Sequence, residues 1–339
     1  MAATSAQRLA VRAYVCAAMP DCSVGSVTVI ERLASGENHV VYRCSYLDRK
    51  GDTRDVVVRG GSGDDAERTR AHREAAVMHK VGGVAGPEIY DFRPAWPGFP
   101  GPVACMQFVP GQQRELNSAH ERDMQHLGGV VRGLHALSVE GLVELGPRDA
   151  SFSGYAEERW RAHLDSRLQS IRDPLPPVLQ QRLRAAVGLV SDAIEQLTAH
   201  TDAGTNEELV LLHADISGSN VIWAPHPVLI DWEYARFGDP ADEVAYLFTQ
   251  NDLNQSQRAA FWRGYGHAMT ASTLGDLMDR VRRWEPMTLL GSIMWWIDAW
   301  SRAEAALPVT SGSLPRTADY YLLQALDRLD RFDRMFLQA

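Results

Sequence analysis

The chain has few cysteines and lacks a long hydrophobic run. Four cysteines occur among 339 residues, and their spacing matches neither a Cys-x-x-Cys pair nor a zinc pattern. A chain of this length does not need disulfides, so we expect free thiols and a cytoplasmic protein. The longest apolar candidate, Leu289 to Trp300, is too short to cross a membrane and is interrupted by Asp298. Because Arg8 and Arg12 interrupt the amino-terminal apolar stretch, we expect neither a signal peptide nor a transmembrane segment.

The sequence also lacks an excess of positive charge. It contains 34 Lys and Arg residues against 43 Asp and Glu residues, which gives a net charge of -9. Such a surface repels a polyanionic backbone, so we expect no nucleic-acid partner. Hydrophobic residues make up 45% and charged residues 23% of the chain, which is typical of globular proteins and excludes a mostly disordered chain. The sequence leaves monomer and homodimer equally open.

The amino-terminal part of the chain combines β-forming runs with helical segments. The runs 24–33, 38–47 and 55–59 predict an antiparallel meander, and the composition of 65–81 predicts a helix packed on that sheet. After Pro110-Gly111 the composition becomes helical. The expected fold class is therefore α+β. We place helices at 119–137, 155–171 and 179–199, and from Pro240 onward. Asp239 directly precedes Pro240 and suits an N-cap with proline at the first helical position.

A polar segment within the helical part carries the strongest chemical signal. Asp215, Asn220 and Asp231 are flanked by apolar runs, so we expect them to converge at one end of a strand-loop-strand hairpin. Phosphoryl transfer needs such a set, because a carboxylate must receive the proton of the attacking hydroxyl and oxygen ligands must hold Mg²⁺. The alternative is a polar β-turn in which Asp and Asn side chains cap backbone groups.

The order His-x-Asp-x-x-x-x-Asn, followed by an apolar strand ending in Asp, resembles the aminoglycoside phosphotransferase and choline kinase superfamily. The segment Ile230-Asp-Trp-Glu-Tyr-Ala235 strengthens this resemblance. It implies a bilobal protein-kinase-like fold with an antiparallel β-sheet N-lobe and a mostly helical C-lobe. Residues 1–108 would bind the nucleotide, and residues 109–339 would hold the catalytic and substrate-binding groups.

The same resemblance implies roles for single residues. Asp215 looks like the catalytic base or hydroxyl-orienting carboxylate, and Asn220 and Asp231 look like ligands of Mg²⁺. His213 would brace the loop. Glu243 stands where the family usually has Asp, and we expect this departure to affect loop bracing and not catalysis.

A kinase-like nucleotide site needs a phosphate-covering loop, a cation and a helix carboxylate. Arg59, at the end of the third expected strand, stands where protein kinases carry Lys, and Glu74 on the next helix is the matching carboxylate. An exposed strand-end Arg and a solvated Glu are the alternatives for these two residues. The expected loop and hinge residues on the nucleotide are Ser35, Gly36, Asn38, Gln107, Phe108 and Val109.

The acceptor site is expected on the helical part. About nine residues separate Asp231 from the next helix start, too few for the activation segment of a protein kinase, so the acceptor should be a small-molecule hydroxyl. Trp296 and Trp300 share a helix face and could hold a quaternary ammonium, a sugar or a base. Asp298 or Glu233 could pair with an amine. Core packing is the alternative for each tryptophan.

Three functions fit these patterns. The leading interpretation is an enzyme that moves the γ-phosphate of ATP or GTP to a hydroxyl of an antibiotic, aminoglycoside-like or other, and thereby confers resistance. A metabolic kinase of choline or amino alcohols is the second. A non-catalytic nucleotide-binding regulatory protein is the third, and the joint presence of Asp215, Asn220 and Asp231 argues against it.

Overall fold

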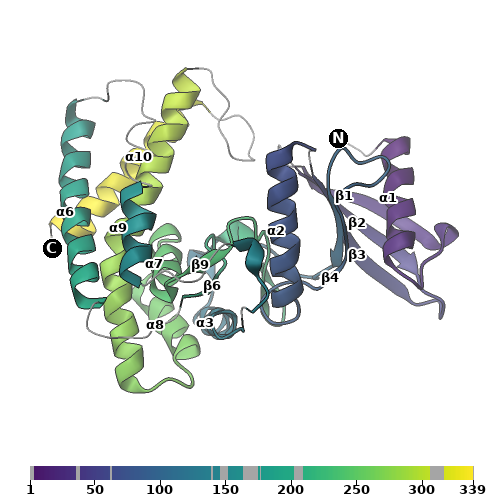
Figure 1. Cartoon of the computed structure of the whole chain (residues 1–339), viewed down its shortest axis with the longest axis horizontal. Coiled ribbons are helices and arrows are strands. Elements are labelled where there is room, and N and C mark those ends of the chain that lie inside the picture. Colours follow the sequence, from purple (N-terminus) through teal and green to yellow (C-terminus); the bar gives the residue numbers. More distant parts are fainter. Residues whose placement is uncertain are drawn as a thin grey trace. The chain divides into compact units, whose positions relative to one another are not determined.

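The computed structural model describes residues 4–35, 39–61, 63–138, 140–145, 152–162, 175, 177–201, 209–305 and 317–338 (Figure 1). The chain forms two compact units that alternate along the sequence. The first unit comprises residues 1–114, 137–146 and 219–235, and the second comprises 115–136, 147–218 and 236–339. Packing alone defines these units, so the functional boundary expected between residues 108 and 109 stays a prediction.

The first unit is built on a five-stranded antiparallel sheet with the order β1-β2-β3-β5-β4. The meander expected from the sequence is therefore confirmed. The register places Arg59 between Val41 on β2 and Ala104 on β5. The strands are β1 (Val27–Ser35), β2 (His39–Leu47), β3 (Thr53–Gly61), β4 (Ile89–Arg93) and β5 (Val103–Gln107).

A helix covers each face of this sheet. Helix α1 (Ser5–Ala18) packs on one face, where Tyr14 and Val58 belong to the same buried core, and α2 (Asp65–Val81) lies on the other face (Figure 1). Successive side chains of a strand point to opposite faces. Arg59, which follows Val58 on β3, therefore points toward α2.

The polar segment singled out in the sequence does not form one hairpin. Strand β7 (Val221–Trp223) pairs with β8 (Pro227–Leu229) in the first unit, whereas β6 (Val210–Leu212) pairs with β9 (Arg236–Gly238) in the second. The expected single strand-loop-strand hairpin is therefore wrong. Apolar runs of three residues show where strands lie, but their composition does not specify which partner each strand takes.

The second unit is mostly helical in the residues that the structure describes. Its helices confirm those expected over 119–137 and 179–199, while most of the helix expected over 155–171 lies outside the described residues. None of the helices within the described residues is long and apolar enough to span a bilayer. The helices are α3 (Glu121–His135), α4 (Phe152–Glu157), α6 (Pro177–Thr201), α7 (Pro240–Gln250), α8 (Gln255–Tyr265), α9 (Ala271–Glu304) and α10 (Ala318–Phe332).

Asp239 begins α7 and ties it to α9. Its carboxylate accepts hydrogen bonds from the Ala241 backbone N–H at 2.8 Å and from the Trp284 indole at 2.9 Å. The Arg280 guanidinium lies 3.0 Å away. Asp239 was expected to cap a helix with Pro240 at its first position, and the structure confirms this. Burial raises the pKa of Asp239 even though Arg280 opposes the shift.

We expect Asp239→Ala to lower the free energy of unfolding by about 3 kcal/mol, because it removes the buried carboxylate that contacts Arg280 and also removes a helix cap. Asp239→Asn should lose less, since the amide oxygen can still cap the helix. Asp279→Ala, which removes an exposed carboxylate on α9, serves as the control and should change stability by less than about 0.5 kcal/mol. Urea unfolding measures all three variants, and equal losses for Asp239→Ala and Asp279→Ala would contradict this account.

Candidate active site

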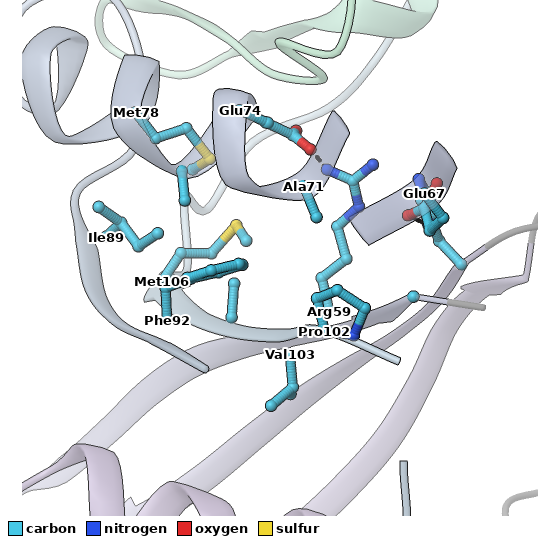
Figure 2. A pocket seen from close by; sticks show the side chains of 14 residues that line it. Arg59, Glu67, Ala71, Glu74, Met78, Ile89, Phe92, Pro102, Val103 and Met106 are labelled. Carbon is cyan, nitrogen blue, oxygen red and sulfur yellow. Dashed lines mark hydrogen bonds and ion pairs between the residues drawn. The ribbon is translucent and has the colours of Figure 1, made fainter. Parts of the chain in front are cut away.

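An arginine held between two carboxylates forms the centre of the first unit's site. Arg59 forms an ion pair with Glu74 on α2, drawn as a dashed line in Figure 2. Its second terminal nitrogen lies 3.5 Å from Asp231 Oδ1. Burial disfavours the charge of Arg59, but the attraction of Glu74 and Asp231 raises its pKa above the ordinary value. Glu74 is thus the carboxylate partner of Arg59, as the sequence led us to expect.

The pocket beside this ion pair is largely apolar. It lies between α2 and the sheet, and Figure 2 shows Met78, Phe92 and Met106 among its lining residues. Water is largely excluded from the Arg59–Glu74 pair, since their side chains are 16% and 8% exposed. Low exposure strengthens the attraction between the two charges.

Asp231 reaches Arg59 because its segment is anchored to the connection between α2 and β4. The Leu229 backbone N–H donates to the Ala85 carbonyl at 2.7 Å, and the buried Trp232 indole donates to the Leu229 carbonyl at 3.1 Å. Gly86 permits this packing, since a Cβ there would lie 3.0 Å from the Trp232 indole nitrogen. Asp231 itself adopts a left-handed backbone with φ of 66°, a conformation that Asp tolerates better than most residues.

Asn220 lies beside the Asp231 segment, because the Ile230 backbone N–H donates to the Asn220 carbonyl at 3.0 Å. Asn220 is buried, whereas the side chain of Asp231 is 43% exposed. Carboxylate and amide oxygens fit Mg²⁺, which usually takes one or two protein ligands and completes its shell with water and substrate phosphates. In the described part of the chain no three His, Cys, Asp or Glu residues form a metal cluster, and the role of Asn220 and Asp231 as ligands of Mg²⁺ stays a prediction.

Glu233 belongs to the same charged neighbourhood. Burial and the nearby charge of Asp231 raise the pKa of Glu233 to about 7, although Arg59 acts in the opposite direction. The sequence suggested Glu233 as a partner for an amine of the acceptor. The structure describes it in the first unit, within electrostatic reach of Arg59 and Glu74, and its contact with an acceptor stays a prediction.

The expected nucleotide loop is described only at its edge. Ser35 is the last residue of β1 and pairs with Val40 on β2. Gly36 and Asn38 lie outside the described residues. Their contact with a nucleotide stays a prediction.

The expected hinge residues follow β5. The Gln107 backbone N–H donates to the Glu88 carbonyl at 2.8 Å, so that donor is already used. The Arg43 guanidinium lies over the Phe108 ring, 4.4 Å from its centroid. The contact of Gln107, Phe108 and Val109 with a purine stays a prediction.

Asp215 lies in the second unit, in the loop that follows β6. Its Oδ1 accepts a hydrogen bond from the Tyr246 hydroxyl at 2.7 Å, and its backbone N–H donates to His213 Nδ1 at 3.3 Å. Asp215 is half-buried, while His213 is fully buried. Asn220 and Asp231 belong to the first unit, so the expected convergence of the three residues stays a prediction.

A buried carboxylate braces the backbone next to Asp215. Ala214 has a left-handed φ of 69°, which is costly for a residue with a Cβ. Its N–H donates to Glu243 Oε1 at 2.6 Å. The other oxygen of Glu243 accepts from His135 Nε2 at 2.7 Å, and the Tyr265 hydroxyl lies 2.7 Å from His135 Nδ1. Glu243 therefore braces this loop, as its position in the sequence led us to expect.

Tyr246 is the site residue that the sequence analysis missed. Glu243 and Tyr246 lie three residues apart on α7, so they share a face of that helix. They contact the consecutive residues Ala214 and Asp215. Helical spacing from Glu243 was the signal that could have identified Tyr246.

The aromatic residues expected at the acceptor site pack together on α9 and α10. The Trp296 ring lies 4.8 Å from that of Trp295, 6.0 Å from that of Tyr320 and 5.9 Å from that of Tyr321. The Arg328 guanidinium lies 4.8 Å from the Trp296 ring. Trp296 therefore already binds an internal cation.

The two other residues expected at the acceptor site lie further along α9. Trp300 is half-buried. Asp298 lies 3.0 Å from Arg302, four residues later on the same helix. Their contact with an acceptor stays a prediction.

The sequence matches the model of the phosphotransferase enzyme family over residues 29–284, well over half of its length. The chain belongs to this family. No curated protein sequence matches this phosphotransferase.

Solved structures resemble this phosphotransferase over almost its full length. A choline/ethanolamine kinase family protein from Mesorhizobium loti has 21% identity and a TM-score of 0.63, covering 97% of this chain and 96% of that one. A thermostable mutant of aminoglycoside phosphotransferase APH(4)-Ia, in a ternary complex with ADP and hygromycin B, has 17% identity and a TM-score of 0.56, covering 96% of this chain and 98% of that one. Spectinomycin phosphotransferase APH(9)-Ia, in complex with ADP and spectinomycin, has 11% identity and a TM-score of 0.53, covering 91% and 90%. These similarities confirm the expected kinase-like fold.

We expect Glu243→Ala to lower the free energy of unfolding by about 2–3 kcal/mol, because the buried Ala214 N–H loses its acceptor. Glu243→Gln is the matched control. Its amide oxygen can still accept from Ala214, so it should lose about 1 kcal/mol, mainly at His135. Urea unfolding measures both variants. If Glu243→Gln and Glu243→Ala lowered the free energy of unfolding equally, the hydrogen bond to Ala214 would not account for the loss.

We expect Tyr246→Phe to lower kcat about tenfold, because the Asp215 carboxylate loses a charge-assisted hydrogen bond that fixes its orientation. The KM for the nucleotide should stay within about twofold, since the change leaves the groups around Arg59 in place. Steady-state kinetics with a coupled assay for the nucleoside diphosphate gives both constants. A variant with unchanged kcat, or one that loses only nucleotide affinity, would show that Tyr246 does not position Asp215.

Proposed function

We propose that this phosphotransferase moves the γ-phosphate of ATP or GTP to a hydroxyl of a small molecule, and that an antibiotic is the leading class of acceptor. The observation that carries this proposal is the ion cluster in which Arg59 joins Glu74 to the half-exposed carboxylate of Asp231. Arg59 presents a fixed, charged fork of donors, as a phosphate site requires. The family match supports the reaction class.

The first unit supplies the groups for the nucleotide. Arg59 would bind oxygens of the α- and β-phosphates, while Glu74 keeps its guanidinium oriented. Asn220 and Asp231 would hold Mg²⁺, which neutralises charge on the β- and γ-phosphates when bound. Asp231 is suited to this role, because its side chain is 43% exposed. A metal ion could reach its carboxylate from the side that Arg59 does not occupy.

The second unit supplies the group for the acceptor. Asp215 would accept the proton of the attacking hydroxyl or orient that hydroxyl toward the γ-phosphorus. The new bond joins the acceptor oxygen to phosphorus, the bond to the bridging oxygen of the nucleotide breaks, and the nucleoside diphosphate leaves. The hydrogen bond from Tyr246 and the brace at Ala214 hold Asp215 in one orientation.

The structural neighbours support an antibiotic acceptor, since two of them were solved with ADP together with hygromycin B or spectinomycin. A choline or amino-alcohol kinase is the second candidate, and the similarity to the Mesorhizobium loti protein favours it. The Arg328 guanidinium already lies over the Trp296 ring, which argues against a quaternary ammonium ligand on that ring. A regulatory protein that binds a nucleotide without turnover would not need Asp215, the proposed acceptor of the hydroxyl proton.

Two matched variants test the proposal. Asp215→Asn should lower kcat by about two orders of magnitude while the Kd for Mg·ATP stays within about twofold, because the proton acceptor is lost but the phosphate groups are kept. Asp231→Asn should weaken Mg²⁺-dependent ATP binding at least about tenfold. Calorimetry with and without Mg²⁺ gives the affinities, and mass detection of phosphorylated acceptors gives the turnover.

The roles proposed for Asp215 and Asp231 require that the first variant loses turnover and the second loses Mg·ATP affinity. Near-normal turnover of Asp215→Asn would defeat the assignment of the base, and unchanged Mg·ATP affinity of Asp231→Asn would refute its role as a ligand. If the unmodified protein bound Mg·ATP but phosphorylated none of a panel of aminoglycosides, nucleosides, macrolides and amino alcohols, the regulatory alternative would replace the enzymatic one.

A further inference from the structure

Arg328 is a charged residue of the second unit that the proposed reaction leaves without a role. It lies on α10, which packs against α9 (Figure 1), and its guanidinium lies 4.8 Å from the Trp296 ring. Its Nε donates to Ser292 Oγ at 3.1 Å. Its Nη1 donates to the carbonyl and side-chain oxygens of Gln324 at 3.3 and 2.9 Å. These contacts hold the guanidinium in one position.

Arg328 forms no ion pair within the described residues, because no carboxylate there lies within 4.0 Å of it, although the charge of the neighbouring Asp327 partly offsets its own. Two other arginines on these helices, Arg302 on α9 and Arg331 on α10, do have a carboxylate partner. Arg302 has Asp298 at 3.0 Å, and Arg331 has Asp252 at 3.3 Å. Burial lowers the pKa of Arg328, which shows that its surroundings disfavour the charge. Arginine nevertheless stays protonated, so an anionic partner would be stabilising.

One donor of Arg328 remains available. Nη2 accounts for none of its hydrogen bonds to the described residues, and it is not among the buried atoms that lack a partner. This nitrogen therefore reaches solvent. Three hydrogen bonds and the contact with the Trp296 ring already fix the guanidinium, and Nη2 is available. Arg328 can therefore bind an oxyanion with little loss of side-chain entropy.

Arg328 also lies on the same unit as the proposed base. Tyr246, whose hydroxyl donates to Asp215, is close enough to Arg328 to interact with it electrostatically. The Trp296 ring lies against the guanidinium and itself contacts the Tyr320 ring, so the two rings offer apolar surface beside Arg328. A bound acceptor could thus contact this cation while its hydroxyl faces Asp215.

We propose that Arg328 binds an oxyanion of the acceptor, so that the substrate is an alcohol that also carries a carboxylate or a phosphate and is not a polyamine. This inference rests on the proposed function and narrows its substrate class. Within antibiotics it selects anionic compounds over polycationic ones. The Trp296 ring, in this arrangement, holds the arginine and not the substrate's own cation.

Matched pairs of ligands test the subsite. We would measure the binding of gluconate against sorbitol for a carboxylate, and of glucose 6-phosphate against glucose for a phosphate, together with serine against ethanolamine for a smaller acid. Calorimetry on the full chain in the presence of Mg·ADP gives each Kd. We expect at least one acid to bind about tenfold more tightly than its uncharged or decarboxylated match. The pair that shows the difference identifies the anion.

Variants on α10 assign that difference to Arg328. Arg328→Gln should abolish the preference for the acid. Arg331→Gln removes the same net charge three residues away, where the arginine already has a carboxylate partner, and should keep the preference. Arg328→Lys retains the charge and should keep part of the preference for the acid. This result would distinguish loss of the subsite from a folding defect. Urea unfolding checks that all three variants fold.

The outcomes separate this inference from the proposed function. The subsite is refuted if no acid binds better than its match, or if Arg328→Gln keeps the preference. If neutral or cationic acceptors are phosphorylated as efficiently as acids, the kinase stands and the anionic subsite falls. If an acid binds through Arg328 but Asp215→Asn and the unmodified protein are equally inactive toward it, the subsite stands and the proposed transfer to that acceptor falls.

Discussion

The hydrogen bond between the Ala214 backbone and the buried Glu243 carboxylate is the contact on which the chemistry of the second unit depends. A left-handed alanine is strained, and a buried N–H without an acceptor is more costly still, so this backbone shape persists only where a fixed acceptor is supplied. His135 fixes that acceptor from the other side. The direction of the Asp215 side chain follows from the shape of the backbone that precedes it.

In the first unit, opposite charges stabilise a buried group that would otherwise be costly. A buried guanidinium is tolerated because Glu74 and Asp231 compensate for the water that Arg59 has lost. The two carboxylates differ in exposure, with side chains that are 8% and 43% accessible. Glu74 is therefore suited to hold the cation permanently. Asp231 retains oxygens that another ligand can reach.

This geometry gives a physical reason for arginine where protein kinases carry lysine. One terminal nitrogen of Arg59 faces Glu74 and the other lies 3.5 Å from Asp231. A planar fork with a fixed spread can contact both carboxylates in one orientation, whereas an ammonium presents a single centre. The same property matters at Arg328, where ring contact and hydrogen bonds orient the fork and leave one nitrogen free.

Local patterns in the sequence determined much of this protein. The α+β class, the antiparallel meander and the capped start of α7 at Asp239 were predicted correctly, because alternation, helical spacing and caps depend on near neighbours in the chain. The motif also identified Asp215 and Asp231 as candidates. The family model then confirmed the reaction class that the motif had suggested.

Only the tertiary structure decided which distant segments meet. The pairing of β6 with β9, the contact of Tyr246 with Asp215 and the lack of an ion pair at Arg328 among the described residues all depend on groups more than twenty positions apart or on different helices. A three-residue apolar strand or a single tyrosine looks the same in sequence whichever partner it takes. Packing selects the partner, because each buried polar group must find its complement among the side chains that the whole fold brings near.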